Sequence, residues 1–139
     1  MNNILEKMKF HHIGIAVKNG VETSSVYALL GGGKIIDKIF DPVQNVNISW
    51  LKSDNRPLLE FLEPVDEKSP VNKILEKNGV TPYHICYEVE NINDTIKELR
   101  NHKFVLVSKP SVAPALDNHL VAFLFHKETG LIELVEIPQ

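Results

Sequence analysis

The sequence repeats itself once, and this repeat limits the possible fold more than any other feature. Each half reads as one strand, one helix and then three strands, because apolar residues alternate in the strands and recur at helical spacing between them. The first copy covers about residues 9–64 and the second about 82–138, with a short linker helix expected at about 69–79. The sequence therefore predicts an α+β fold of two tandem βαβββ modules that form a curved mixed sheet, shaped as one cup.

Glycine and proline mark where the expected elements begin and end. Ser69 is expected to cap the linker helix, with Pro70 in its first position and Gly79 at its exit. A long Pro- and Ala-containing connection is expected at 109–120. It reads either as a segment that closes over a ligand, with Asn118 or His119 near it, or as an ordinary surface loop. We expect strands at 10–17, 34–40, 46–53, 57–64, 83–89, 103–110, 120–127 and 131–138, and helices at 20–30, 69–79 and 92–102.

Two glutamates lie inside strands that otherwise have the pattern of a protein interior. Glu60 belongs to "LLEFLEPV" (58–65) and Glu133 to "LIELVEIP" (131–138), 73 positions later. A buried, unpaired carboxylate costs several kcal/mol or more, so each needs a compensating partner. His12 opens the first copy and His84 the second, 72 positions later. Polar residues thus recur at the same offset as the apolar pattern.

These four residues together predict a metal site. Two imidazoles and two carboxylates suit borderline divalent ions such as Fe, Co, Ni and Zn. Taken singly, each histidine reads as a hydrogen-bonded residue and each glutamate as part of a solvated face. Their matching offsets favour a common site instead, with His12, Glu60, His84 and Glu133 as ligands. Four ligands in an open cup leave coordination positions for substrate, which indicates a catalytic site.

Four stretches of the sequence resemble one known family: "HHIGIAVKN", "LLEFLEPVDEKSPVNKILEKNG", "YHICYEVENIN" and "GLIELVEIP". They are similar to the vicinal oxygen chelate superfamily (the glyoxalase/bleomycin-resistance/dioxygenase fold), within it to the bacterial glyoxalase I and methylmalonyl-CoA epimerase branch. The resemblance runs from Phe10 to Pro138 and implies a single domain over residues 1–139. It implies the same four metal ligands and one divalent ion per site, with Ni²⁺ or Co²⁺ favoured and Zn²⁺ as a further choice.

The resemblance implies a glyoxalase I-like lyase, comparable to lactoylglutathione lyase. Such an enzyme converts the hemithioacetal of methylglyoxal and a thiol to a 2-hydroxyacyl thioester through a metal-bound enediolate. By resemblance, Glu133 is the expected catalytic base and Glu60 its partner on the opposite face. The ring-cleaving dioxygenases of the superfamily use two histidines and one carboxylate, so the additional Glu60 disfavours them.

Two alternative functions stay open. The first is a methylmalonyl-CoA epimerase-type acyl-thioester isomerase. Epimerases of the family carry a glutamate in a "PEQGV"-like turn, whereas "DPVQNV" (41–46) has Val43 there, which favours the glyoxalase interpretation. The second is a non-catalytic module that binds a small molecule, as in the drug-sequestering members of the superfamily; the complete ligand set favours an enzyme.

Composition and charge exclude other classes. The net charge is −3 with both signs interspersed, which predicts no nucleic-acid surface. No apolar run approaches the roughly 20 residues that cross a membrane. Cys86 is the only cysteine, as expected for a cytoplasmic protein. The expected partners are a thiol–aldehyde adduct or an acyl thioester, together with a second copy of the chain in a homodimer.

Overall fold

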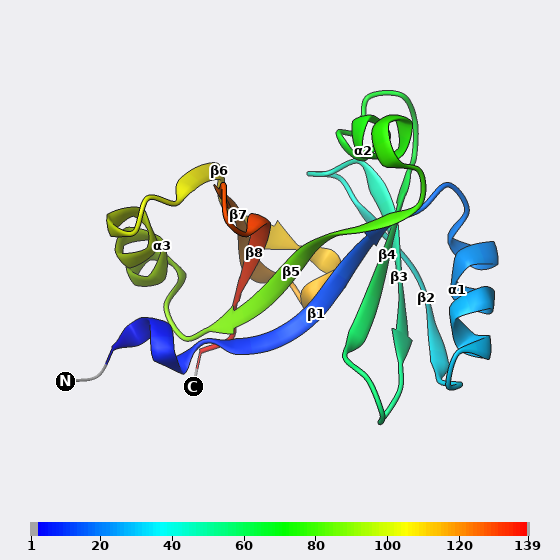
Figure 1. The fold of residues 1–139 in the computed structure, drawn as a ribbon, viewed down its shortest axis with the longest axis horizontal. Helices are drawn as coiled ribbons and strands as arrows, with labels where there is room; N and C mark the ends of the chain where they lie inside the picture. The colour runs from blue at the N-terminus through cyan, green and yellow to red at the C-terminus, as the bar shows by residue number, and fades with distance from the viewer. Residues whose placement is uncertain (1–2, 139) are drawn as a thin grey trace. The chain divides into compact units, whose positions relative to one another are not determined.

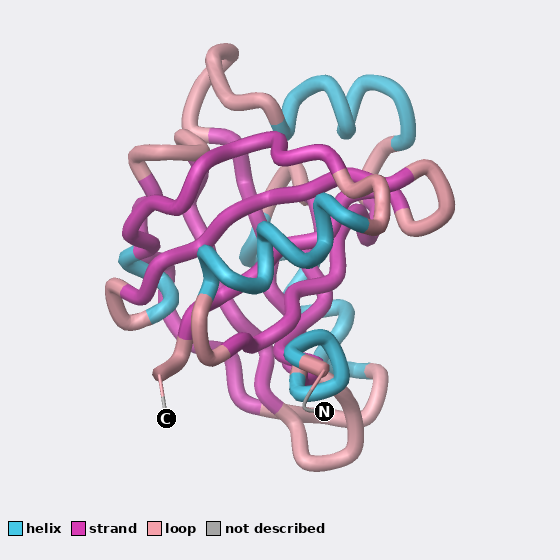
Figure 2. Tube along the Cα trace, turned by 90° about the vertical axis from the view of Figure 1, so that its left-hand side faces the viewer, coloured by secondary structure: helices cyan, strands magenta, loops and turns pink. Residues whose placement is uncertain are grey.

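The computed structural model describes residues 3–138, in which strands make up more of the chain than helices do (Figure 2). Strands and helices follow one another along the chain in the order that the repeat predicts. The strands are β1 (Lys9–Ala16), β2 (Lys34–Asp41), β3 (Val46–Lys52), β4 (Leu58–Pro64), β5 (Thr81–Val89), β6 (Val105–Ala113), β7 (His119–His126) and β8 (Gly130–Glu136). The helices are α1 (Gly20–Leu29), α2 (Val71–Asn78) and α3 (Ile92–Asn101), with short 3-10 turns η1 (Ile4–Lys7) and η2 (Pro114–Leu116).

Module one consists of β1–β4 and α1. Its strands follow the order β2-β3-β4-β1, and β1 runs parallel to β4 while the other neighbours are antiparallel. Helix α1 lies along β2, β3 and β4 (Figure 1). It covers an apolar cluster in which Ile15 of β1 and Val17, directly after β1, meet Leu51, Leu59 and Phe61. The odd-numbered residues of β1 therefore face the helix, which leaves the even-numbered ones on the other face of the sheet.

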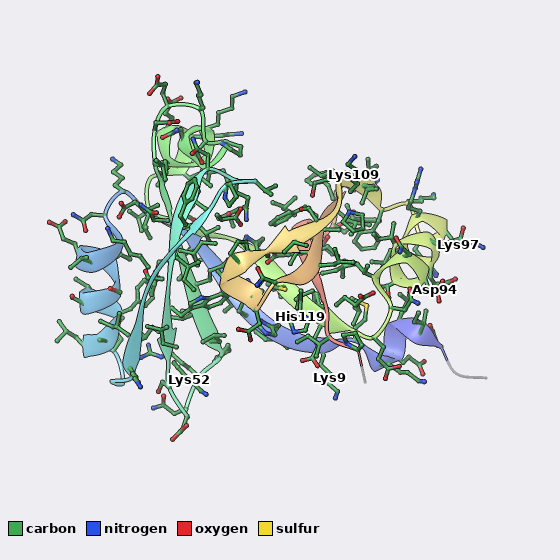
Figure 3. All side chains as sticks on the ribbon, turned by 180° about the vertical axis from the view of Figure 1, so that it is seen from behind. Lys9, Lys52, Asp94, Lys97, Lys109 and His119 are labelled. Carbon is green, nitrogen blue, oxygen red and sulfur yellow. The ribbon has the colours of Figure 1, made fainter. Side chains whose placement is uncertain are left out.

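Module two consists of β5–β8 and α3. The strand order is β5-β8-β7-β6, with β5 parallel to β8 and the remaining pairs antiparallel. Helix α3 presents an apolar stripe to the sheet, where Ile92, Ile96 and Leu99 join a buried cluster. Its Asp94 and Lys97 are exposed on the opposite side and are labelled in Figure 3. Each module thus repeats the same arrangement of one helix on one four-stranded sheet.

The chain divides into two compact units near the boundary of the modules. One unit is His12–Tyr83, and the described residues before and after it form the other. The predicted α+β fold of two βαβββ modules with mixed sheets is confirmed. Between Asn3 and Pro138, no helix has the length and apolar character needed to span a lipid bilayer.

The start of α2 differs from the prediction by one residue. The N-cap position belongs to Pro70, which already has a helical backbone conformation, and Val71 is the first helical residue. The Ser69 hydroxyl accepts a hydrogen bond from the Val71 N–H at 3.3 Å and donates one to the carbonyl of Gln44 at 3.0 Å. Ser69 therefore connects the helix start to the β2–β3 turn. The expected exit at Gly79 is confirmed, with φ of +71°.

The prediction of a long connection at 109–120 is wrong. Strand β6 extends to Ala113 and pairs with β7, which begins at His119. Lys109 and His119, labelled in Figure 3, therefore both lie on strands. The strand tolerates Pro110 because the β6–β7 register shifts between Ser108 and Ser111, a bulge where the missing N–H breaks no ladder bond. A left-handed pair, Asp117 and Asn118, completes the turn.

Candidate metal centre

Module one brings His12 and Glu60 together. Parallel pairing of β1 with β4 places Gly14 opposite Glu60, so His12 lies two residues earlier on the same face. The Nε2 atom of His12 is 3.2 Å from Oε1 of Glu60. Both residues are buried, with 0% of His12 and 2% of Glu60 exposed. The pair thus consists of an imidazole and a carboxylate in contact, away from solvent.

Module two brings His84 and Glu133 together in the same way. Parallel pairing of β5 with β8 places Cys86 opposite Glu133, and His84 again lies two residues earlier. Its Nε2 atom is 3.3 Å from Oε1 of Glu133, and both residues are buried. Each module therefore brings together the imidazole and the carboxylate that recur at the offset of the sequence repeat.

The apolar neighbours of each glutamate explain how a carboxylate can lie inside a strand. Leu59 and Phe61 flank Glu60 in sequence and pack on the helix side of the sheet. Ile132 and Leu134 do the same beside Glu133. Because side chains alternate along a strand, burying these residues directs the glutamate to the other face. A shift of register by one residue would place each carboxylate in the apolar core, so the two clusters specify the register.

One aromatic ring lies across each site histidine. The Trp50 ring is 4.9 Å from that of His12, centroid to centroid, at an interplanar angle of 87°. The Phe123 ring is 5.4 Å from that of His84 at 89°. Trp50 stands opposite Glu60 in the β3–β4 register, and Phe123 stands opposite Glu133 in the β7–β8 register. The 73-residue offset of the sequence repeat relates Trp50 and Phe123 as well.

A second glutamate on each ligand-bearing strand was missed from the sequence. Glu63 accepts a hydrogen bond from the Gly20 N–H at 2.7 Å, and Glu136 accepts one from the Ile92 N–H at 2.9 Å. These are the first residues of α1 and α3, whose N–H groups have no partner within the helix. The motif Glu-x-x-Glu therefore serves two purposes in each module: the first carboxylate faces a histidine, and the second caps a helix.

The donor atoms of each pair fit a divalent metal ion. Imidazole and carboxylate ligands bind zinc-like ions at about 2.0–2.2 Å. With a donor–metal–donor angle of about 90–109°, the two donor atoms then lie about 3.0–3.4 Å from each other. The separations of 3.2 Å and 3.3 Å lie in this range. A cation would also compensate the burial of Glu60 and Glu133, each 2% exposed. The donor chemistry of both pairs is that of a site for a borderline ion.

The turn that was compared with epimerases, at 41–46, carries no carboxylate at its centre. Asp41 is buried and accepts hydrogen bonds from the N–H groups of Val43 at 2.8 Å and Gln44 at 3.2 Å. Its carboxylate stabilises the turn, and the Val43 side chain is 60% exposed. Asn45 adopts a φ of +55° and donates to Asp66 at 2.6 Å. The turn is therefore held in place at both ends.

Comparisons with known proteins place the chain near one group of enzymes. It is 29% identical over 132 residues to the mitochondrial methylmalonyl-CoA epimerase of Homo sapiens, covering 94% of this chain and 73% of that protein. Among solved structures, a hypothetical protein of Bacillus halodurans C-125 is similar with a TM-score of 0.81 and 29% identity, over 96% of both chains. A variant of Streptomyces coelicolor methylmalonyl-CoA epimerase, in complex with 2-nitronate-propionyl-CoA, is similar with a TM-score of 0.79 and 25% identity, covering 92% of this chain and 96% of that one.

These similarities correct the expected function. The prediction of a glyoxalase I-like, lactoylglutathione lyase-like activity is wrong, because the relatives from Homo sapiens and Streptomyces coelicolor, which match 94% and 92% of the chain, are named methylmalonyl-CoA epimerase. The four expected ligands do not separate the two activities, because the resemblance that implies them covers both, and Val43 is a single position within a match of 132 residues. The preference for nickel, which followed from the glyoxalase interpretation, has no support either.

The family itself follows from the length of the match and from the repeated module. Residues 11–123, well over half of the chain, match the family described as the Glyoxalase/Bleomycin resistance protein/Dioxygenase superfamily. The paired βαβββ modules and their buried His–Glu pairs agree with the resemblance seen in the sequence. The chain belongs to the glyoxalase/bleomycin resistance protein/dioxygenase superfamily.

Proposed function

We propose that this protein is a divalent-metal-dependent epimerase that inverts C2 of a 2-substituted malonyl-CoA thioester, such as methylmalonyl-CoA. The observation that carries the proposal is the repeated buried pair, His12 with Glu60 and His84 with Glu133. The names of the relatives supply the substrate class, since they act on methylmalonyl-CoA or bind an acyl-CoA analogue.

In this proposal His12, Glu60, His84 and Glu133 together hold one ion. Each pair offers only two donor groups, so a stable site draws on both modules. Bound there, the ion would supply Lewis-acid stabilisation of the charge that develops on the thioester carbonyl. The charge of the ion also explains why both carboxylates are tolerated in the interior. Cobalt, zinc and other borderline ions all suit these ligands.

The carboxylates are the groups in the proposed site that can move a proton. The hydrogen on C2 is acidic because the electron pair left by its removal delocalises onto the neighbouring carbonyl oxygen. We assign its removal to Glu133 and the return of a proton on the opposite face to Glu60. A placed general base accelerates such a step by roughly 10²–10⁴-fold. Val43 has no group that could take part, so the two site carboxylates carry both transfers.

The test uses full-length protein, stripped of metal and then loaded with Co²⁺, Zn²⁺ or Mn²⁺. One stereoisomer of methylmalonyl-CoA is incubated in D₂O, deuterium at C2 is measured by mass spectrometry, and inversion is measured with a stereospecific coupling enzyme. We expect metal-dependent deuterium uptake together with inversion. Glu133→Gln should reduce both by at least about 100-fold, while Glu67→Gln, at an exposed surface position, serves as the matched control.

Failure of this test takes a definite form. If the metal-loaded protein neither exchanges nor inverts C2 of methylmalonyl-CoA or ethylmalonyl-CoA, the proposed reaction is refuted. If an acyl-CoA binds tightly without any exchange, the chain is a binding module instead. Inversion that survives complete removal of metal would refute the role of the ion while leaving the substrate class intact.

A further inference from the structure

Each site histidine lies against one aromatic ring in both modules. We propose that Trp50 and Phe123 are positioning residues, which hold the imidazole planes of His12 and His84 so that each Nε2 faces the glutamate of its own module. This inference rests on the metal binding proposed above. The two ring pairs are nearly perpendicular, at 87° and 89°. Perpendicular contact restricts rotation of the imidazole about its bond to Cβ, which is the motion that would carry Nε2 away from the carboxylate.

The strand register supports this role. Trp50 is paired with Glu60 across β3 and β4, and Phe123 is paired with Glu133 across β7 and β8. Paired residues on neighbouring strands point to the same face of a sheet. Each aromatic ring therefore neighbours the glutamate of its module and also contacts the histidine. Both rings are themselves confined, with only 5% of Trp50 and 9% of Phe123 exposed.

The outer strand is irregular beside each ring. In module one the β2–β3 register shifts directly after Ile36, the residue paired with Trp50. In module two it shifts on both sides of Ser108, the residue paired with Phe123. The Ser108 hydroxyl there accepts a hydrogen bond from the Phe123 N–H at 3.1 Å. Such bulges bend a strand and redirect the side chains beside them. The same device occurs in both copies at the position that directs the aromatic ring.

The experiment replaces each ring and measures metal affinity. Loss of a group that orients a metal ligand typically weakens affinity by about 10–100-fold. We expect Trp50→Leu and Phe123→Leu each to weaken Co²⁺ binding at least about tenfold. Trp50→Phe gives module one the ring that module two already has, so it should recover most of the affinity. The visible absorption band of bound Co²⁺ reports the ligand geometry and should change in the leucine variants.

Phe61→Leu is the matched control. Phe61 follows Glu60 directly and is fully buried, but its ring packs on Tyr27 on the helix side of the sheet. The substitution removes the same volume as Phe123→Leu, without touching a histidine. It should lower the midpoint of chemical unfolding while leaving Co²⁺ affinity and the absorption band unchanged.

The outcomes separate this inference from the proposed function. If wild-type protein binds Co²⁺ and both leucine variants keep its affinity and its band, the positioning role is refuted and the proposed function stands. The role is also refuted if Phe61→Leu loses as much affinity as they do. If Trp50→Leu does not fold, Phe123→Leu decides alone. If wild-type protein binds no divalent ion, the proposed metal site falls, and this inference falls with it.

Discussion

The carboxylate of Glu63 accepts a hydrogen bond of 2.7 Å from the N–H of Gly20, at the start of α1. The same bond joins Glu136 to Ile92 at the start of α3. Each helix is thereby attached to the strand that carries a site glutamate three residues earlier. A negative charge at a helix N-terminus is favourable because it meets the positive end of the helix dipole and the unpaired N–H groups. The helices therefore help to hold the strands that present Glu60 and Glu133.

We predict that Glu63→Ala lowers the free energy of unfolding by about 1 kcal/mol, the usual cost of losing a capping side chain. Glu63→Gln keeps an acceptor oxygen but loses the charge, so it should lose only part of this stability. Urea titration followed by circular dichroism measures both. Glu67→Gln, at a nearby exposed position, is the control and should leave the midpoint unchanged. Equal stability of Glu63→Ala and the wild type would show that the bond is not stabilising.

Much of the fold could be predicted from the sequence because the repeat supplies two readings of every element. A strand that is ambiguous in one copy can be checked against the other. Comparing the two copies therefore predicts the βαβββ order of elements in both. The extension of β6 to Ala113 could not be predicted, because a proline such as Pro110 is compatible with a strand only at a sheet edge or a bulge, and the sequence pattern shows neither. Its bulge makes the proline compatible with pairing, and bulges leave little trace in a sequence pattern.

The candidate site was predictable to the extent that its residues are chemically unusual in their positions. A glutamate within an apolar strand stands out, so Glu60 and Glu133 were found at once. Glu63 and Glu136 were not, because a glutamate near a strand end is ordinary and the helix start that it caps is more than 40 residues away in sequence. Trp50 and Phe123 do not stand out either, because an aromatic residue within a strand is ordinary in a protein core, where both lie. Applying the repeat offset to every polar and aromatic residue would have identified all of them.

Binding of a divalent ion should raise thermal stability. A ligand that binds only the folded state stabilises it by about 2.7 kcal/mol when present at 100 times its dissociation constant. We expect Zn²⁺ or Co²⁺ to raise the melting temperature of metal-free protein, and EDTA to reverse the change. His84→Ala should abolish most of the shift, whereas His102→Ala, at an exposed position on another part of the same module, should keep it. A shift that is equal in both variants would place the ion elsewhere.

Gly33, between α1 and β2, should tolerate no side chain. Its φ is +128°, and an added Cβ would lie 2.8 Å from the Lys52 carbonyl oxygen. Gly33→Ala therefore combines backbone strain with a steric clash and should cost about 1–3 kcal/mol of unfolding free energy. Gly32→Ala is the matched control, because its φ is also positive at +74° but nothing lies within 4 Å of an added Cβ. Chemical unfolding of both variants measures the difference, and equal losses would rule out the clash as a cause.

Val43 offers a test of the proposal that Glu60 and Glu133 carry both proton transfers. The turn around it is held by Asp41, which accepts hydrogen bonds from two N–H groups of the turn, and by Asn45, which donates to Asp66. Because the Val43 side chain is exposed and contributes little to the core, Val43→Glu should fold normally. Because Glu60 and Glu133 are proposed to carry both proton transfers, a further carboxylate in this turn has no step left to perform. Inversion of methylmalonyl-CoA by metal-loaded Val43→Glu should therefore stay at the wild-type rate.

Val43→Gln separates the effect of a base from that of a polar side chain. The amide has the shape of the carboxylate but accepts no proton at neutral pH, so it should not accelerate inversion. The ratio of inversion to deuterium uptake is the informative measurement, because a base on a second face increases inversion more than exchange. A Val43→Glu variant that folds, binds metal and inverts about tenfold faster than Val43→Gln would contradict the assignment of both proton transfers to Glu60 and Glu133.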